Sequence, residues 1–262
     1  MMMNKILLTF LILINFYFQA KTQYSTFNAH SHNDYANNPP FRLACNNHFG
    51  SIEADIWAVK SELFVAHYER EIKPERTLDS LYIQPIVRMF RENNGKAWKE
   101  ITGTFQLLID LKTPVEPTLS LLSEKLKLYP DVFDPEINEN SVRIVITGNR
   151  PDPSEFGNYP EFIFFDGLLN IKYNSDQLAR VPMFSENFKN ISSWNGTGEI
   201  TGKEKSRLEN TIDSVHSLNK KIRFWNSPDN PHAWNTFLRM GIDYINTDKI
   251  IKLAEYLNAK GN

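Results

Sequence analysis

Short apolar runs separated by helical patterns recur along almost the whole chain of 262 residues. Runs such as LLIDL and FIFF are apolar at nearly every position, which is typical of strands buried on both faces of a parallel sheet. Strands that alternate with helices predict parallel pairing through helical crossovers. Eight strands are expected, at residues 24–30, 51–59, 105–112, 142–148, 162–169, 181–188, 221–227 and 243–249, and a ninth run follows the second strand at 62–67. Helices are expected at 77–93, 117–128, 201–219, 231–240 and from Ile250 onward.

About eight strand–helix units in about 240 residues predict a closed (β/α)8 barrel, the TIM barrel, rather than an open doubly wound sheet. The hydrophobic content of 41% supports a sizeable core, and no linker rich in Gly, Ser or Pro divides the chain. The net charge is −2, whereas nucleic-acid binders usually carry an excess of basic residues, so no nucleic-acid partner is expected. With Cys45 as its single cysteine, the chain can form neither an intrachain disulfide nor a zinc–thiolate cluster.

The N-terminal sequence has the pattern of a secretory signal peptide. Lys5 precedes an apolar run from Ile6 to Phe18, which is too short for a confident membrane span. Ala20 is a plausible cleavage point, although Phe18 makes a poor A-x-A pattern, and an uncleaved anchor is the alternative. The sequence therefore predicts a signal peptide at residues 1–20, export of the protein, and a single barrel domain at residues 21–262.

Polar residues recur where the predicted strands end. His30, His32 and Asn33 end the first strand, Glu53 and Asp55 lie two apart in the second, and His67 ends the run after it. Active sites of α/β barrels form at the carboxyl ends of the strands, so we expect these side chains to meet at one rim. Further polar residues expected there are Asp110, Lys112, Asn226 and Asp248.

Each of these residues also has a plainer interpretation. A Glu-x-Asp pair usually lies on a solvent-exposed strand edge. His67 can be a loop residue whose hydrogen bonds are made by its neighbours, and Asp110 with Lys112 can form an internal ion pair. Here the Glu-x-Asp pair interrupts an apolar strand, where two unpaired carboxylates would be costly. A bound cation is the natural compensation.

The donor types favour a hard cation and phosphodiester chemistry. Asn and carboxylate side chains offer oxygen ligands only, which suits Ca²⁺ or Mg²⁺ and not zinc. Two histidines can act as general base and general acid near neutral pH. A cation with a lysine can hold a phosphoryl group and neutralise charge on its oxygens. Cleavage of a phosphodiester fits this set best, and a hydroxyl next to the ester could attack first to give a cyclic phosphate.

The same segments resemble a known superfamily. SHNDY resembles the SHNTY segment of phosphoinositide-specific phospholipases C, and SIEADIW followed by LFVAH resembles their E-x-D strand and second catalytic histidine. LLIDLK and RFWNSPDN…GIDYINTDK are similar to segments of glycerophosphodiester phosphodiesterases. The chain thus resembles the phospholipase C-like phosphodiesterase superfamily of TIM barrels from the first strand to the last.

This resemblance implies a role for each matching position. It implies that His32 and His67 are catalytic and that Lys112 meets the phosphate. The implied metal ligands are Asn33, Glu53, Asp55 and Asp110.

The chain also departs from the family pattern. The phosphodiesterases begin with His-Arg-Gly, and aligning AHSH on their AHRG would make His30 the catalytic residue. His32 is preferred because Asn33 and Tyr35 then match as well. Asp110 replaces a glutamate and is one methylene shorter, so its contact with a metal could be direct or through water.

The expected function is therefore a metal-dependent phosphodiester hydrolase that acts on a glycerophosphodiester, a phosphoinositide-like lipid or a related phosphodiester. Trp225 and Asn226 are expected to contact the substrate. A non-catalytic phosphate- or lipid-binding barrel and an enzyme that only cyclises its substrate are the alternatives. The sequence leaves open the head group, the choice between Ca²⁺ and Mg²⁺, peripheral contact with a membrane, and the oligomeric state.

Overall fold

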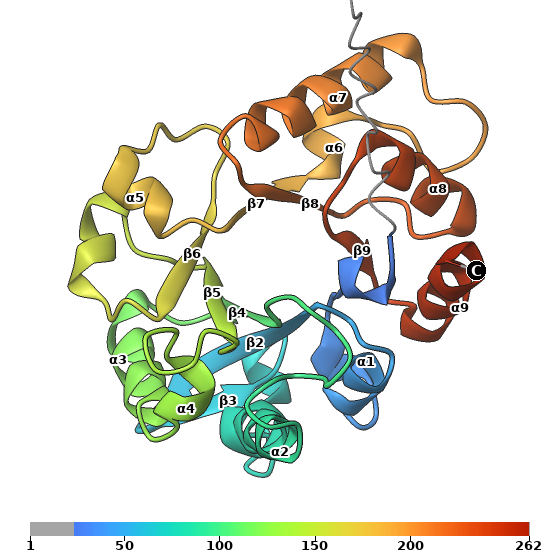
Figure 1. Ribbon diagram of the computed structural model, residues 1–262. Helices are drawn as coiled ribbons and strands as arrows, with labels where there is room; N and C mark the ends of the chain where they lie inside the picture. The colour runs from blue at the N-terminus through green and yellow to red at the C-terminus, as the bar shows by residue number, and fades with distance from the viewer. Residues whose placement is uncertain (1–23, 262) are drawn as a thin grey trace, which may run out of the picture.

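The computed structural model describes residues 24–261, and eight parallel strands in it form a nearly closed ring with helices outside (Figure 1). This arrangement confirms the predicted (β/α)8 barrel. The predicted signal peptide lies outside the described residues. No helix within residues 24–261 is long and apolar enough to span a lipid bilayer. The barrel strands are β1 (Ala29–Ser31), β2 (Ser51–Val59), β4 (Gln106–Leu111), β5 (Arg143–Gly148), β6 (Ile163–Gly167), β7 (Met183–Asn187), β8 (Lys221–Trp225) and β9 (Ile245–Thr247).

The strands pair in the order β8-β7-β6-β5-β4-β2-β1-β9. The remaining seam, between β8 and β9, is bridged in parallel at Arg223 and Tyr244. There the Tyr244 N–H donates to the Ile222 carbonyl at 3.3 Å. The ninth apolar run is β3 (Glu62–Val65), which pairs antiparallel with β2 and stays off the barrel path.

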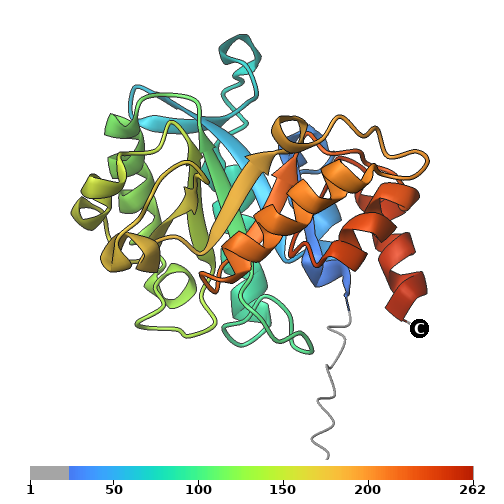
Figure 2. The same ribbon diagram turned by 90° about the horizontal axis from the view of Figure 1, so that it is seen from above.

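Helices cover the outside of the ring and connect successive strands (Figure 2). The helix expected at 77–93 begins as a π-helical turn at Asp79–Ile83 and continues as α2. The strand expected at 24–30 is shorter, because Ser25 Oγ accepts from the Phe27 N–H at 3.2 Å and caps a 3-10 turn at Thr26–Asn28. The α-helices are α1 (Arg42–Asn46), α2 (Gln84–Glu92), α3 (Val115–Leu126), α4 (Pro130–Phe133), α5 (Ser175–Ala179), α6 (Phe188–Ile191), α7 (Gly202–His216), α8 (Pro231–Met240) and α9 (Ile250–Gly261).

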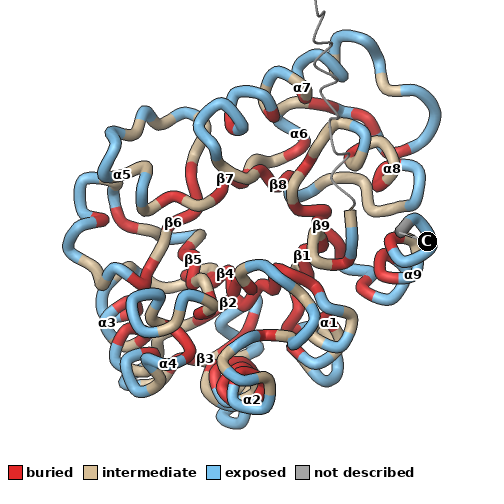
Figure 3. The backbone as a smooth tube through the Cα atoms, in the orientation of Figure 1, coloured by how far each residue is buried: buried red, intermediate tan, exposed pale blue. Residues whose placement is uncertain are grey.

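The period of two along each strand separates an apolar outer layer from a polar interior. In β2, Ile52, Ala54 and Ile56 belong to the large core shared with the helices, and all three are fully buried. Buried segments, red in Figure 3, follow the strands of the ring. The inner faces contribute a small separate apolar cluster of Leu108, Val145, Met183 and Tyr244, with Phe164 packed against it. Further along the same inner faces, towards the carboxyl ends of the strands, the side chains become polar.

A buried aspartate fixes the loop that follows β1. The Asp34 carboxylate accepts from the Phe41 N–H at 2.6 Å, the Ser31 hydroxyl at 2.8 Å and the Tyr82 hydroxyl at 2.9 Å. These bonds join α1 and the π-helical turn to the end of β1. They hold the preceding residue, Asn33, in a left-handed conformation with φ of 48°.

Replacing Asp34 by alanine should therefore destabilise the fold strongly. Three buried donors would lose their acceptor, so we expect the free energy of unfolding to fall by about 3 kcal/mol or more. Urea denaturation followed by circular dichroism measures this change. Asp131→Ala, on the exposed surface of α4, is the matched control and should shift stability by less than about 0.5 kcal/mol. Equal stability of the two variants would contradict the anchoring role of Asp34.

Candidate active site

The polar inner faces of the strands open into one cavity of about 500 Å³. The cavity lies where β2, β4 and β8 end, as the carboxyl-end rule for barrels predicts. The structure brings together most of the residues singled out in the sequence. Those that line the cavity are His32, Asn33, Glu53, Asp55, His67, Asp110, Lys112 and Trp225.

The two histidines of β1 and its end lie at different depths. His30 is fully buried beneath the cavity, with Nδ1 2.8 Å from Ser51 Oγ and Nε2 3.1 Å from Glu53 Oε2. Burial, reinforced by the charge of Arg223, lowers the pKa of His30 to about 3. His30 is therefore neutral at physiological pH and does not line the cavity.

His32, by contrast, reaches the cavity and is held by a carboxylate. Its Nδ1 lies 2.8 Å from Asp248 Oδ1, and its Nε2 lies 3.8 Å from Glu53 Oε1. Burial lowers the pKa of His32, but the hydrogen bond to Asp248 and the charge of Glu53 outweigh it, so the pKa stands above its ordinary value. Asp248, which the sequence also placed at the rim, thus orients this ring.

His67 faces the same cavity from the end of β3. Its side chain is 44% exposed, and its Nδ1 lies 2.9 Å from Asp55 Oδ2. The Tyr35 hydroxyl lies 3.0 Å from the same nitrogen and 2.5 Å from Asn33 Oδ1. Tyr35 thereby connects His67 to the loop that carries Asn33.

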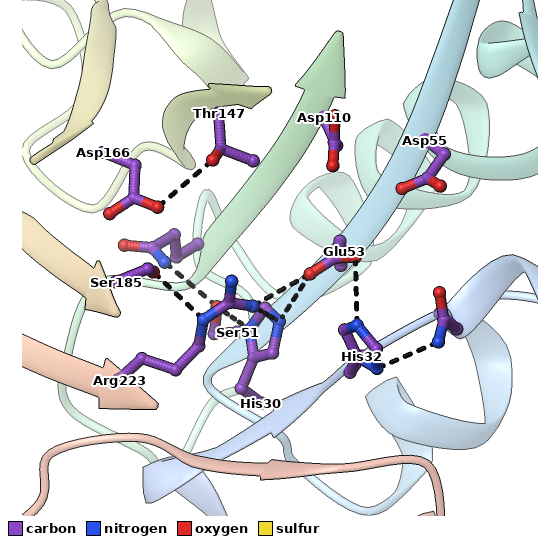
Figure 4. A network of polar contacts seen from close by, with 12 residues as sticks. His30, His32, Ser51, Glu53, Asp55, Asp110, Thr147, Asp166, Ser185 and Arg223 are labelled. Carbon is purple, nitrogen blue, oxygen red and sulfur yellow. Dashed lines mark hydrogen bonds and ion pairs between the residues drawn. The ribbon is translucent and has the colours of Figure 1, made fainter. Parts of the chain in front are cut away.

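At the floor of the cavity, Glu53 is paired with an arginine from the far side of the barrel (Figure 4). Arg223 Nη1 donates to Glu53 Oε2 at 2.8 Å, also contacts the His30 ring, and its Nε donates to Ser185 Oγ at 3.1 Å. Burial raises the pKa of Glu53, but the hydrogen bond from His30 and the charge of Arg223 outweigh it and hold the pKa well below its usual range.

A second charged group lies above this floor. Lys112 Nζ lies 2.9 Å from both Asp55 Oδ2 and Asp110 Oδ2. Burial is the main cause that raises the pKa of both Asp55 and Asp110, and the charge of Lys112 opposes it. The two aspartates are directly paired in the register of β2 and β4, which places both on the inner face.

The oxygen atoms at this rim are of the type that hard cations prefer as ligands. Asp55 Oδ1 is buried without a hydrogen-bond partner in the described part of the chain. The side chains of Asn33, Glu53 and Asp110 line the same cavity and offer further oxygen ligands. Among residues 24–261, no group of three or more His, Cys, Asp or Glu side chains is arranged so that it could hold a metal ion. Lys112 and Arg223 provide the positive charge that balances these carboxylates in this structure.

Several polar residues of the cavity were not singled out in the sequence. Besides Arg223 and Ser185, Asp166 of β6 lies in the cavity wall, where its Oδ2 accepts from the Thr147 hydroxyl at 3.2 Å. Burial raises the pKa of Asp166. Arg223 in KIRFW and Asp166 in FIFFD are charged residues inside apolar strands, which is the same signal that identified Glu53.

The two residues expected to contact substrate lie at the edge. Trp225 is 40% exposed and lines the cavity. Asn226 follows it with φ of 55°, and its Nδ2 donates to Asn187 Oδ1 at 3.2 Å. Asn226 therefore supports Asn187, which lines the cavity, and lies outside the lining itself.

Comparisons with solved structures confirm the type of barrel. The structure of a glycerophosphodiester phosphodiesterase from Parabacteroides distasonis is similar, with a TM-score of 0.51 at 12% sequence identity. The likeness covers 90% of this chain and 98% of that chain, so the shared fold extends over the whole barrel.

Sequence comparisons identify the family. Altered inheritance of mitochondria protein 6 from Saccharomyces cerevisiae is 29% identical over 273 residues, covering 87% of this chain and 70% of the yeast protein. The protein of the same name from Eremothecium gossypii is 27% identical, covering 87% of this chain and 68% of its own length. Residues 221–251 match the glycerophosphoryl diester phosphodiesterase family, in agreement with the resemblance noted in the sequence. Residues 19–166, more than half of the chain, match the AIM6-like phosphodiesterase domain, and the chain belongs to that family.

Proposed function

We propose that this protein hydrolyses phosphodiesters by general acid–base catalysis with His32 and His67. One observation carries the proposal: both histidines line the same cavity, and the Nδ1 of each lies within 2.9 Å of a carboxylate oxygen, from Asp248 and Asp55 respectively. A carboxylate at Nδ1 fixes the tautomer and the orientation of the ring, so Nε2 is presented for proton transfer.

The two histidines divide the proton transfers of the reaction. One neutral imidazole accepts the proton of the attacking oxygen as the new P–O bond forms. The other, protonated, gives its proton to the departing alkoxide as the old P–O bond breaks. Lys112 is placed to neutralise charge on the phosphoryl oxygens. Trp225 provides an apolar wall for the organic part of the substrate, such as a glycerol moiety or a head group.

We further propose that Asn33, Glu53, Asp55 and Asp110 hold Ca²⁺ or Mg²⁺. The unpartnered Asp55 Oδ1 and the all-oxygen donor set support this assignment. A bound cation would supply positive charge to the phosphoryl oxygens during the reaction. The substrates proposed are a glycerophosphodiester, a phosphoinositide-like lipid or a related phosphodiester, and export after signal-peptide cleavage is proposed from the N-terminal sequence.

Alanine substitution of either histidine should lower kcat. We expect a loss of about 10²- to 10⁴-fold for His32→Ala and for His67→Ala, the usual contribution of one acid or base. The double variant should lose less than the product of the two, because both residues serve one transition state. A nitrophenyl phosphodiester needs little protonation of its leaving group, so it should partly rescue the variant that lacks the acid. Steady-state kinetics with both kinds of substrate would assign the two roles.

Two control variants accompany these measurements. His232→Ala, on the exposed surface of α8, should retain full activity. His30→Ala should mainly lower stability and should cost less kcat than His32→Ala. A folded but inactive His30→Ala with a near-normal His32→Ala would transfer the catalytic role to His30. Tight binding of phosphodiesters without turnover by the unmodified protein would instead indicate a non-catalytic barrel.

Removal of divalent cations should abolish activity and lower thermal stability. EDTA should reduce hydrolysis to background, and Ca²⁺ or Mg²⁺ should restore it. Because a ligand that binds only the folded state stabilises it, the cation should also raise Tm, as measured by differential scanning fluorimetry. Asp110→Asn should weaken the Tm response, whereas Asp176→Asn on exposed α5 should leave it unchanged. Full activity after exhaustive chelation, without a Tm response, would show that the cation has no role.

A further inference from the structure

A second cavity of about 680 Å³ adjoins the catalytic one and shares His67 and Asn33 with it. Its outer wall is the segment of residues 66–76 between β3 and the π-helical turn, which projects from one end of the barrel in Figure 2. Nothing in the proposed chemistry uses this space. His67 lies at the junction of the two cavities, so the second cavity adjoins the place proposed for the substrate.

The lining of this second cavity carries more positive than negative charge. Arg70, Lys73 and Arg76 line it, and Glu71 is the one acidic residue among its lining residues. None of the three cations forms a salt bridge to a carboxylate within residues 24–261. A concave surface with an excess of one sign of charge concentrates ligands of the opposite sign. The ligand favoured here is therefore an anion.

Two of these cations are held in place by neighbours of the catalytic residues. Arg76 Nη2 donates to the Tyr35 carbonyl at 2.5 Å. The Arg70 guanidinium lies 4.3 Å from the centroid of the Tyr68 ring, and that ring meets the His67 ring edge-on with centroids 4.4 Å apart. Cations fixed in this way lose less conformational freedom on binding than free side chains do.

We propose that this second cavity, here called the basic subsite, binds an additional anionic group of the substrate, a phosphomonoester or a carboxylate. The inference rests on the proposed function and narrows its substrate class to phosphodiesters with a second negative charge on the portion beside His67. Arginine forms paired, charge-assisted hydrogen bonds with phosphate and carboxylate groups, so Arg70 and Arg76 suit this ligand better than a neutral polyol.

Two glycerophosphodiesters that differ by one group test the basic subsite: glycerophosphoglycerol and glycerophosphoglycerol phosphate. The wild-type protein should prefer the phosphorylated compound by about tenfold or more in kcat/KM, which corresponds to about 1.4 kcal/mol. The preference should shrink at high ionic strength, because salt screens exposed charges. The double variant Arg70→Gln/Lys73→Gln should reduce the preference to below about threefold.

A matched double variant controls for the loss of two charges. Lys96→Gln/Lys99→Gln changes two exposed lysines in the loop before β4, at the opposite end of the strands. This variant should keep the preference. Hydrolysis of both compounds without a preference in the wild type, or a preference that survives Arg70→Gln/Lys73→Gln, would overturn the basic subsite and leave the proposed function standing.

A binding measurement separates failure of the subsite from failure of the proposed function. Calorimetric titration of the His32→Ala variant with glycerophosphoglycerol phosphate should give a Kd about tenfold lower than with glycerophosphoglycerol. Adding Arg70→Gln/Lys73→Gln should remove that difference. If the wild type hydrolyses neither compound but the difference in Kd is present, the phosphodiesterase proposal fails and the basic subsite holds. Equal Kd values would overturn the subsite. Inhibition of both hydrolyses by inorganic phosphate that Arg70→Gln/Lys73→Gln removes, without a preference between the two compounds, would assign the cations to free phosphate and not to the substrate.

Discussion

The ion pair between Glu53 and Arg223 is the interaction on which the arrangement of the site depends. It crosses the barrel interior from β2 to β8, and His30 and Ser185 complete its hydrogen bonds. Two buried charges are expensive to desolvate, and loss of one partner leaves the other uncompensated. The pair therefore fixes a polar layer in the interior, and Glu53 and Arg223 both line the cavity that this layer closes off. A cation bound at Glu53 would share that carboxylate with Arg223.

Depth along one strand gives two neighbouring histidines different chemistry. His30 and His32 are two residues apart in β1 and the residue after it, so both side chains point to the inner side of the barrel. One lies in the Glu53–Arg223 layer and is kept neutral, while the other lies one layer higher beside Asp248. The sequence shows the shared side of the strand, but it does not show where the floor of the cavity falls.

The alternation of strand and helix patterns in the sequence predicted the barrel and its eight strands. The period of two along a strand predicted that Glu53 and Asp55 share the inner face of β2. The sequence did not predict which side chains meet across the barrel interior. Those contacts, such as the one between β8 and β2, depend on the order and register of the strands. Arg223 was missed for this reason, although it interrupts an apolar strand in the same way as Glu53. The predicted start of the first strand was wrong, because a hydrogen bond from the Phe27 N–H to Ser25 Oγ turns part of an extended pattern into a 3-10 turn.

The pairing of β1 with β9 has a consequence for how the chain folds. β1 pairs with β9, so Ala29 lies beside Ile245 and the His32 N–H donates to the Thr247 carbonyl at 3.0 Å. These contacts join the first and last strands within residues 24–261, and such high contact order slows folding, because a long loop must close before the contacts form. A nascent chain that lacks β9 leaves β1 with an unpaired edge. The position of His32 is thus settled only after the C-terminal part of the chain has been synthesised.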